Sequence, residues 1–124
     1  MIKPGEREIK NAQVFRALME RNYAPLLIRI INEIADEFGV YITEAWREPM
    51  HNGDVHSTNP GRGMDLRVTV YESLERAEQI KNSINKRWEY DFKRPELKVA
   101  IIHGEGHNKH FHIQTHKKTR LRQL

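Results

Sequence analysis

The sequence predicts a single α+β domain in which helices flank a small, mainly antiparallel sheet. Three observations carry this prediction. A chain of 124 residues is long enough for one modest core. Apolar residues recur at helical spacing in stretches that are interleaved with short stretches of strand character. The last two strand-like stretches are separated only by a short loop containing glycine, which is typical of an antiparallel hairpin.

The strongest helical signal covers residues 24–38. Pro25 suits a first helical turn, and Gly39 suits the position just after the last turn. The apolar residues at helical spacing are Leu26, Leu27, Ile30, Ile31, Ile34 and Phe38. A weaker helix is expected before this one, with one apolar side formed by Val14, Phe15, Leu18 and Met19.

Two strands joined by a long loop are expected next. Residues 40–46 alternate as a strand does, with Val40, Ile42 and Glu44 set against Tyr41, Thr43 and Ala45. Residues 47–63 contain prolines and glycines throughout and predict a loop, and loops of this length are commonly functional. Residues 64–70 return to strand, with one face carrying Leu66, Val68 and Val70 and the other Asp65, Arg67 and Thr69.

The C-terminal part predicts a helix followed by a hairpin. The helix covers residues 72–88 and is apolar at Leu74, Ala77, Ile84 and Trp88. Strands at 99–103 and 110–115 are joined by residues 104–109. Because side chains alternate along a strand, His110, His112, Gln114 and His116 are expected on one face, and Phe111 and Ile113 on the core face.

The composition limits the kinds of metal ligand and the cellular locations that the chain can have. The chain has no cysteine, so disulfides and thiolate ligands are excluded and any metal must use His, Asp, Glu or water. No apolar run approaches the length of a membrane span, and the first residues do not resemble a secretory signal. We therefore expect synthesis in the cytoplasm.

The positive charge is confined to the C-terminal end. The formal net charge of +4 equals the charge of Lys117, Lys118, Arg120 and Arg122, so residues 1–116 are neutral. We accordingly divide the chain into a domain of residues 1–116 and a basic tail of residues 117–124. Such a tail suits an anionic surface such as a cell wall or nucleic acid, or it is a solvated, frayed end. The neutral body argues against nucleic acid as the partner.

Histidines dominate the functional signal. Five of the seven lie in the last quarter of the chain: His103, His107, His110, His112 and His116. Upstream, His56 and Asp65 bracket a glycine-containing turn. Imidazole and carboxylate ligands from two separate parts of a domain are typical of a catalytic zinc with an open coordination position. The combination favours a metal site over a row of exposed histidines, and a metal hydrolase is the leading hypothesis.

The two motifs resemble those of zinc D-alanyl-D-alanine carboxypeptidases and phage L-alanyl-D-glutamate endopeptidases. The first motif runs from His56 to Asp65, and the second reads His107-Asn-Lys-His110-Phe-His112. In that family the first motif is usually Ser-x-His-x-x-Gly-x-Ala-x-Asp, and the second ends in His-x-His or a close variant. The resemblance covers essentially the whole chain in element order, and it implies the zinc-binding fold shared by these D,D-peptidases and hedgehog domains.

The resemblance also implies roles for individual residues. It implies that Zn²⁺ is bound by His56, Asp65 and His112. His110 then stands beside the metal, and Arg47 contacts the substrate or a developing oxyanion. The implied activity is that of a zinc metallopeptidase acting on peptidoglycan stem peptides, as a D,D-carboxypeptidase or an endolysin-type endopeptidase. The small size and the lack of a signal resemble a phage or prophage lysis enzyme that acts on the cell wall after release.

The chain departs from the family pattern in three places. Its first motif is two residues longer, so Asn59-Pro60 resembles a loop insertion. Asp54 and Gly63 stand where the motif has Ser and Ala. Lys109 stands where most members carry an acidic general base. The general base could therefore be His107, His110 or Glu105.

Three other functions compete with a peptidase. A zinc-stabilised, non-catalytic binding module on the same fold is favoured by the missing acidic base. A metal-dependent nuclease or phosphoesterase is favoured by the basic tail, but the neutral body and the shortage of acidic ligands for magnesium oppose it. A metal-free structural protein of a phage particle is the third. The bond cleaved and the oligomeric state stay open.

Overall fold

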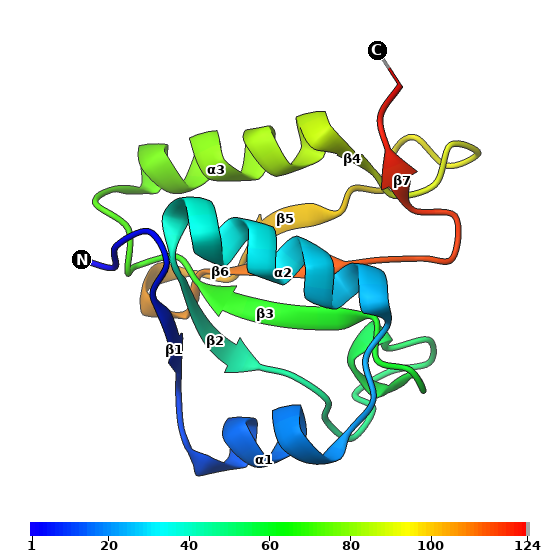
Figure 1. Ribbon diagram of the computed structural model, residues 1–124, viewed down its shortest axis with the longest axis horizontal. Helices are drawn as coiled ribbons and strands as arrows, with labels where there is room; N and C mark the ends of the chain where they lie inside the picture. Colours follow the sequence, from blue (N-terminus) through cyan, green and yellow to red (C-terminus); the bar gives the residue numbers. More distant parts are fainter. Residues whose placement is uncertain (124) are drawn as a thin grey trace.

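A computed structural model describes residues 1–123, which form three α-helices, a five-stranded sheet and a two-stranded sheet (Figure 1). The helices are α1 (Ala12–Glu20), α2 (Pro25–Phe38) and α3 (Leu74–Arg87). The main sheet has the order β1-β2-β3-β6-β5, built from β1 (Arg7–Ile9), β2 (Val40–Glu44), β3 (Gly63–Arg67), β6 (His110–Gln114) and β5 (Ala100–His103). Among these described strands only β1 and β2 pair in parallel. The predicted α+β class with a mainly antiparallel sheet is confirmed.

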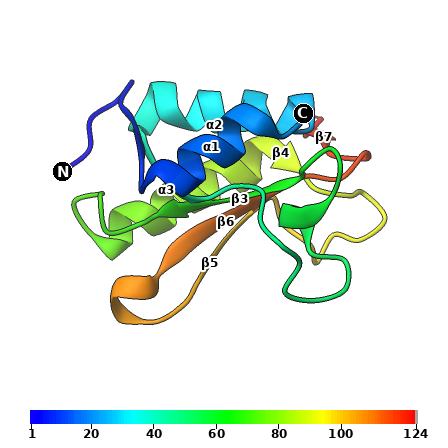
Figure 2. The ribbon, with the colours of Figure 1, turned by 90° about the horizontal axis from the view of Figure 1, so that it is seen from below.

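The main sheet has one covered face and one open face. Helices α2 and α3 lie over the same face, and α1 lies beside β1 and β2 (Figures 1 and 2). The side chains buried between the layers include Leu27, Ile30, Ile80, Leu66 and Phe111. Along β6 the half-buried residues alternate with buried ones. The prediction that Phe111 and Ile113 face the core, with His110 and His112 on the other side, is therefore confirmed.

Helix α2 ends where the sequence predicts. Pro25 occupies its first turn, and its buried side is formed by Leu27, Ile30, Ile31, Ile34 and Ala35. Gly39 follows with a φ of +82°, and a Cβ atom there would collide with the carbonyl oxygen of Lys3. Glycine is thus required for the chain to leave the helix and enter β2 directly. None of the described helices is long and apolar enough to cross a membrane.

Strand boundaries differ from the predicted ones. β2 ends at Glu44 and β3 ends at Arg67, short of the expected ends at residues 46 and 70. The pairing between β2 and β3 shifts register between Ile42 and Glu44, which is the signature of a β-bulge. β1 was not predicted, because all three of its residues are exposed and give no alternating pattern.

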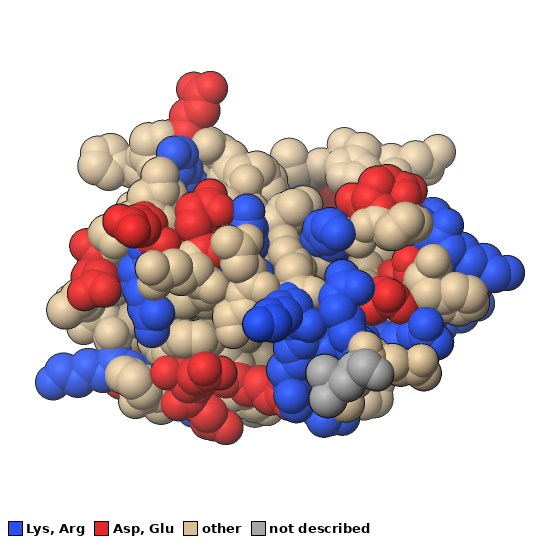
Figure 3. Space-filling view, turned by 90° about the horizontal axis from the view of Figure 1, so that it is seen from above, with Lys and Arg blue, Asp and Glu red and all other residues tan. Residues whose placement is uncertain are grey.

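The basic tail is part of the fold, so the frayed-end interpretation is wrong for residues 120–121. These residues form β7 (Arg120–Leu121), which pairs antiparallel with β4 (Trp88–Glu89). Arg120 Nε and Arg122 Nη1 contact the Glu89 carboxylate at 3.0 and 3.2 Å. Basic side chains gather near the C-terminal end of the described chain, next to acidic ones (Figure 3). Part of the positive charge is therefore neutralised locally.

Candidate metal centre

The loop between β2 and β3 positions His56 against the sheet. A 3-10 helix, η1 (Val55–Ser57), interrupts this loop, and the buried Asp54 carboxylate caps it by accepting from the His56 backbone N–H at 3.0 Å. Asp54 also accepts from Met50 N at 3.2 Å. At Gly63 a Cβ atom would collide with the Val55 side chain. The glycine at the start of β3 thus allows the loop to approach the strand closely and to bury His56 completely.

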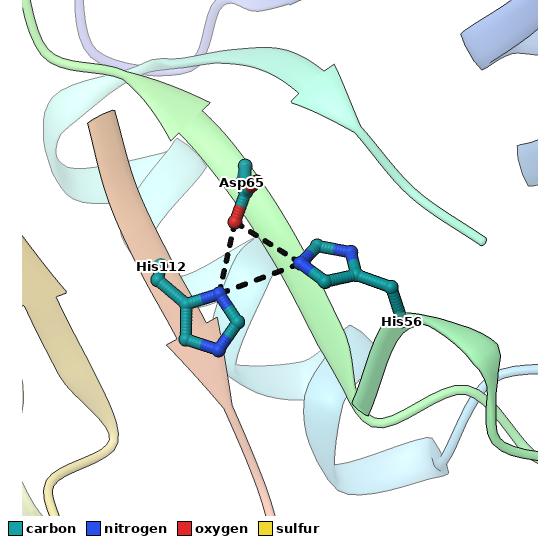
Figure 4. Close-up of side chains that lie close together, drawn as sticks. All are labelled: His56, Asp65 and His112. Carbon is teal, nitrogen blue, oxygen red and sulfur yellow. Dashed lines mark hydrogen bonds and ion pairs between the residues drawn. The ribbon is translucent and has the colours of Figure 1, made fainter. Parts of the chain in front are cut away.

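His56, Asp65 and His112 meet on the open face of the sheet (Figure 4). His56 Nε2 lies 3.2 Å from Asp65 Oδ1, and His112 Nδ1 lies 3.0 Å from the same oxygen. The two imidazole nitrogens are 3.4 Å apart. Ligand atoms bound to one tetrahedral zinc are separated by about 3.4 Å, given bonds of about 2.1 Å. The spacing fits a single ion, and the cluster could hold a metal.

Each imidazole is fixed by a carbonyl oxygen outside the cluster. His56 Nδ1 donates to the backbone carbonyl oxygen of Ala45 at 2.9 Å. His112 Nε2 donates to Gln114 Oε1 at 3.2 Å, and the Gln114 amide is oriented by its own bond to the Lys98 carbonyl oxygen at 2.9 Å. Because a neutral imidazole carries one N–H, the lone pairs of His56 Nε2 and His112 Nδ1 face inward. Such outward hydrogen bonds are typical of metal-binding histidines.

Three atoms with lone pairs, His56 Nε2, Asp65 Oδ1 and His112 Nδ1, therefore converge on one point, where a metal ion could bind. Burial alone would raise the pKa of Asp65, but the imidazoles of His112 and His56, at 3.0 and 3.2 Å from its carboxylate, hold that pKa well below its usual range. The carboxylate is thus ionised, which is the form that binds a metal.

Arg47 lies next to this cluster. Its Nη1 atom is 3.9 Å from Asp65 Oδ2 and 3.6 Å from Glu44 Oε2. Its Nε atom donates to Asp54 Oδ2 at 3.3 Å. The same buried carboxylate that caps the His56 turn therefore orients the arginine. The structure places Arg47 beside the three candidate ligands.

His110 is also beside the cluster, without being one of the three converging atoms. Its Nε2 atom is 3.6 Å from Asp65 Oδ2. Its Nδ1 atom donates to the Asn108 carbonyl oxygen at 2.8 Å, which leaves the Nε2 lone pair facing the cluster in the neutral ring. Asn108 belongs to the 3-10 helix η2 (Gly106–Asn108), so the hairpin loop fixes the orientation of this imidazole.

An open cleft of about 670 Å³ borders the cluster and is lined by Asp65 and His112. His107 lines this cleft, as a candidate base must, whereas Glu105 is exposed on the hairpin loop and is not among the lining residues. His116 does not share the face of His112, contrary to the prediction. It lies beyond the end of β6, and its ring centroid is 5.8 Å from that of Tyr90.

Two further cleft residues were not predicted from the sequence. His103 pairs with His110 across the hairpin, and their ring centroids lie 4.1 Å apart. Burial, followed by the charge of His110, lowers the pKa of His103. Glu44 lines the cleft although the alternation placed it with the core residues Val40 and Ile42. Pairing the two predicted hairpin strands residue by residue would have placed His103 opposite His110 and so in the cleft. The bulge that turns Glu44 toward the cleft has no signal in the sequence.

The cleft thus combines two of the candidate metal ligands, Asp65 and His112, with several cations and further imidazoles, and the third candidate ligand, His56, is fully buried. A comparison of the chain with protein-family models, with curated proteins and with solved structures gives no significant match.

Proposed function

We propose that this protein is a zinc-dependent peptidase that hydrolyses a peptide bond in peptidoglycan stem peptides, as a D,D-carboxypeptidase or an endolysin-type endopeptidase. The observation that carries the proposal is the convergence of His56 Nε2, Asp65 Oδ1 and His112 Nδ1 within 3.4 Å beside an open cleft. Three protein ligands with an open position are typical of catalytic zinc, whereas structural zinc has four. The motif resemblance supplies the substrate class and a phage or prophage setting.

The residues around the cluster suit amide hydrolysis. Zinc bound there would supply Lewis acidity, which polarises a carbonyl group and lowers the pKa of a water molecule to near neutrality. His110 Nε2 carries a lone pair 3.6 Å from Asp65 Oδ2, so this ring is placed to take a proton from an attacking water. His107 is the second candidate base because it also lines the cleft.

Arg47 has the second role in the proposed reaction. Its guanidinium is held through Nε by Asp54, which leaves Nη1 facing the cluster. A cation in that position stabilises negative charge on a carbonyl oxygen or binds a substrate carboxylate through two parallel hydrogen bonds. A zinc-stabilised, non-catalytic binding module is the second candidate function, and the basic Lys109 in place of an acidic base favours it.

The direct assay incubates zinc-loaded protein with purified sacculi of several wall chemistries. New amino termini or released D-alanine are the expected products. Arg47→Lys should lose most turnover and keep its zinc, because an ammonium group cannot reproduce the planar fork of arginine. Arg76→Lys, on α3 and outside the cleft, should retain turnover. Absence of both products on every wall type would favour the non-catalytic module.

A further inference from the structure

Three cations line the cleft without an ion pair. Lys10, Arg67 and Lys109 all border it, and none of them lies within 4.0 Å of a carboxylate oxygen among residues 1–123. Arg47, the fourth cation, is already engaged by Asp54. Unpaired positive charge around a cleft favours anionic ligands. The position of Arg67 shows where along the cleft such a ligand group would bind.

Arg67 is one step along the strand from the candidate metal ligands. It follows Asp65 by two residues, so both side chains lie on the open face of β3, about 7 Å apart along the strand. Arg67 pairs with His110 in the register, as Asp65 pairs with His112. Its guanidinium carbon lies 4.4 Å from the centroid of the Tyr41 ring. Stacking on an aromatic ring orients the guanidinium and leaves its N–H edge free to donate.

Lys10 borders the cleft from the edge of the sheet. Ile9 pairs with Ile42, and Ile42 pairs with Leu66, so Lys10 lies on the Asp65 side of Leu66 and not level with Arg67. The backbone N–H of Lys10 donates to the Ile42 carbonyl oxygen at 2.9 Å, which fixes the chain just after β1. Glu8 is the acidic residue nearest by register, since it pairs with Tyr41. Glu8 does not line the cleft, and within the described part of the chain it forms no ion pair with Arg67 or Lys10. Neither cation is therefore engaged by a carboxylate within 4.0 Å in the described part of the chain.

Cations thus bracket the candidate metal ligands on both sides. β2 runs antiparallel to β3 and pairs Glu44 with Asp65, so the chain reaches Arg47 at the end of the cleft away from Arg67. An extended peptide advances about 3.4 Å per residue, so about 7 Å corresponds to two residues. A ligand lying along the open face therefore meets Arg47 near the metal ligands and Arg67 about two residues away.

We propose that Arg67 forms a carboxylate-binding subsite that selects peptides carrying an acidic group about two residues from the bond at the metal. This inference rests on the proposed function for the location of the cleaved bond. The selective binding itself does not require turnover. The ligand class is an acidic peptide, and a stem peptide whose D-glutamate keeps a free α-carboxylate belongs to that class.

The test is calorimetric titration of zinc-loaded full-length protein with two stem pentapeptides that end in D-alanyl-D-alanine. The peptides are identical except that the D-glutamate α-carboxyl group is free in one and amidated in the other. A His110→Ala background prevents turnover during the titration. At low ionic strength the free acid should bind about tenfold more tightly, as expected for one charge-assisted hydrogen bond. Arg67→Gln should reduce its affinity to that of the amidated peptide.

Arg76→Gln is the matched control. This arginine also stacks on an aromatic ring, with its guanidinium carbon 5.3 Å from the Phe38 ring centroid, but it lies outside the cleft. It should preserve the tenfold difference. Equal affinities, a difference that survives Arg67→Gln, or no binding of either peptide would overturn the subsite. Selective binding of the free acid without cleavage by the wild type would refute the peptidase and support the subsite. Cleavage of both peptides without selective binding would support the peptidase and refute the subsite.

Discussion

His56 Nε2 and His112 Nδ1 lie 3.4 Å apart although 56 residues separate the two histidines. The two rings face each other through different nitrogens because each donates its N–H group to an outside carbonyl oxygen. The partner is the Ala45 backbone for His56 and the Gln114 side chain for His112. A change that frees either ring should therefore weaken metal binding without removing a ligand.

Gln114→Leu tests this relationship. The leucine side chain cannot accept a hydrogen bond from His112 Nε2, so the imidazole ring loses the contact that fixes its orientation and tautomer. Zinc affinity should fall about 10- to 100-fold, as measured by competition with a chromophoric chelator. Gln13→Leu, on the exposed side of α1, should bind zinc as the wild type does. Equal affinities for Gln114→Leu and wild type would show that this hydrogen bond does not tune the site.

His110 and His112 should respond differently to alanine substitution. His112→Ala removes one converging atom and should abolish stoichiometric zinc binding. His110→Ala should retain zinc and lower kcat by about 10²- to 10⁴-fold, the range for loss of a general base. Zinc content and turnover measured on the same preparations separate the two roles. Loss of zinc in His110→Ala with retention in His112→Ala would reverse the assignment.

Asp54 should be important for stability as well as for the site. Asp54→Ala leaves Arg47 Nε and the backbone N–H groups of Met50 and His56 without their acceptor. We expect the free energy of unfolding to fall by about 2–4 kcal/mol in urea titrations, because bonds to charged groups are lost in a buried position. Asp54→Ser can still cap His56 N and should recover part of the loss. A serine variant no more stable than the alanine variant would contradict the capping role.

The lowered pKa of Asp65 predicts acid sensitivity of the metal-free protein. Burial opposes its ionisation, but its close contacts with the imidazoles of His112 and His56 lower its pKa in the folded state. The resulting stability is present above the unfolded-state pKa of about 3.9 and is lost as the pH falls through the lower folded value. Between about pH 5 and about pH 3 the free energy of unfolding should fall more steeply for wild type than for Asp65→Asn. Asp36→Asn, with a side chain 72% exposed, should keep the wild-type slope.

Features that depend on local periodicity could be predicted from the sequence. The apolar spacing and the flanking Pro25 and Gly39 define α2, and strand alternation places His110 and His112 on the open face. The grouping of His56 with Asp65 followed from the motif, and the cluster of His56, Asp65 and His112 is the one that the structure brings together.

Features that depend on distant contacts could not be predicted. The bulge in β2 turns Glu44 to the cleft, and alternation alone placed it on the core side. β7 forms only because Arg120 and Leu121 meet β4, more than thirty positions earlier in the chain. Glu105 follows a glycine with a φ of +96° and lies on the hairpin loop outside the cleft, a placement set by loop geometry.

The central claim is that His56, Asp65 and His112 bind zinc. The most direct test is the zinc content of protein that has been purified without exposure to a chelator. Elemental mass spectrometry should find about one zinc per chain in the wild type and in Glu105→Ala, whose substitution lies outside the cleft. Asp65→Ala should contain essentially none. A wild type without zinc, or an Asp65→Ala variant that keeps it, would contradict the proposed metal centre.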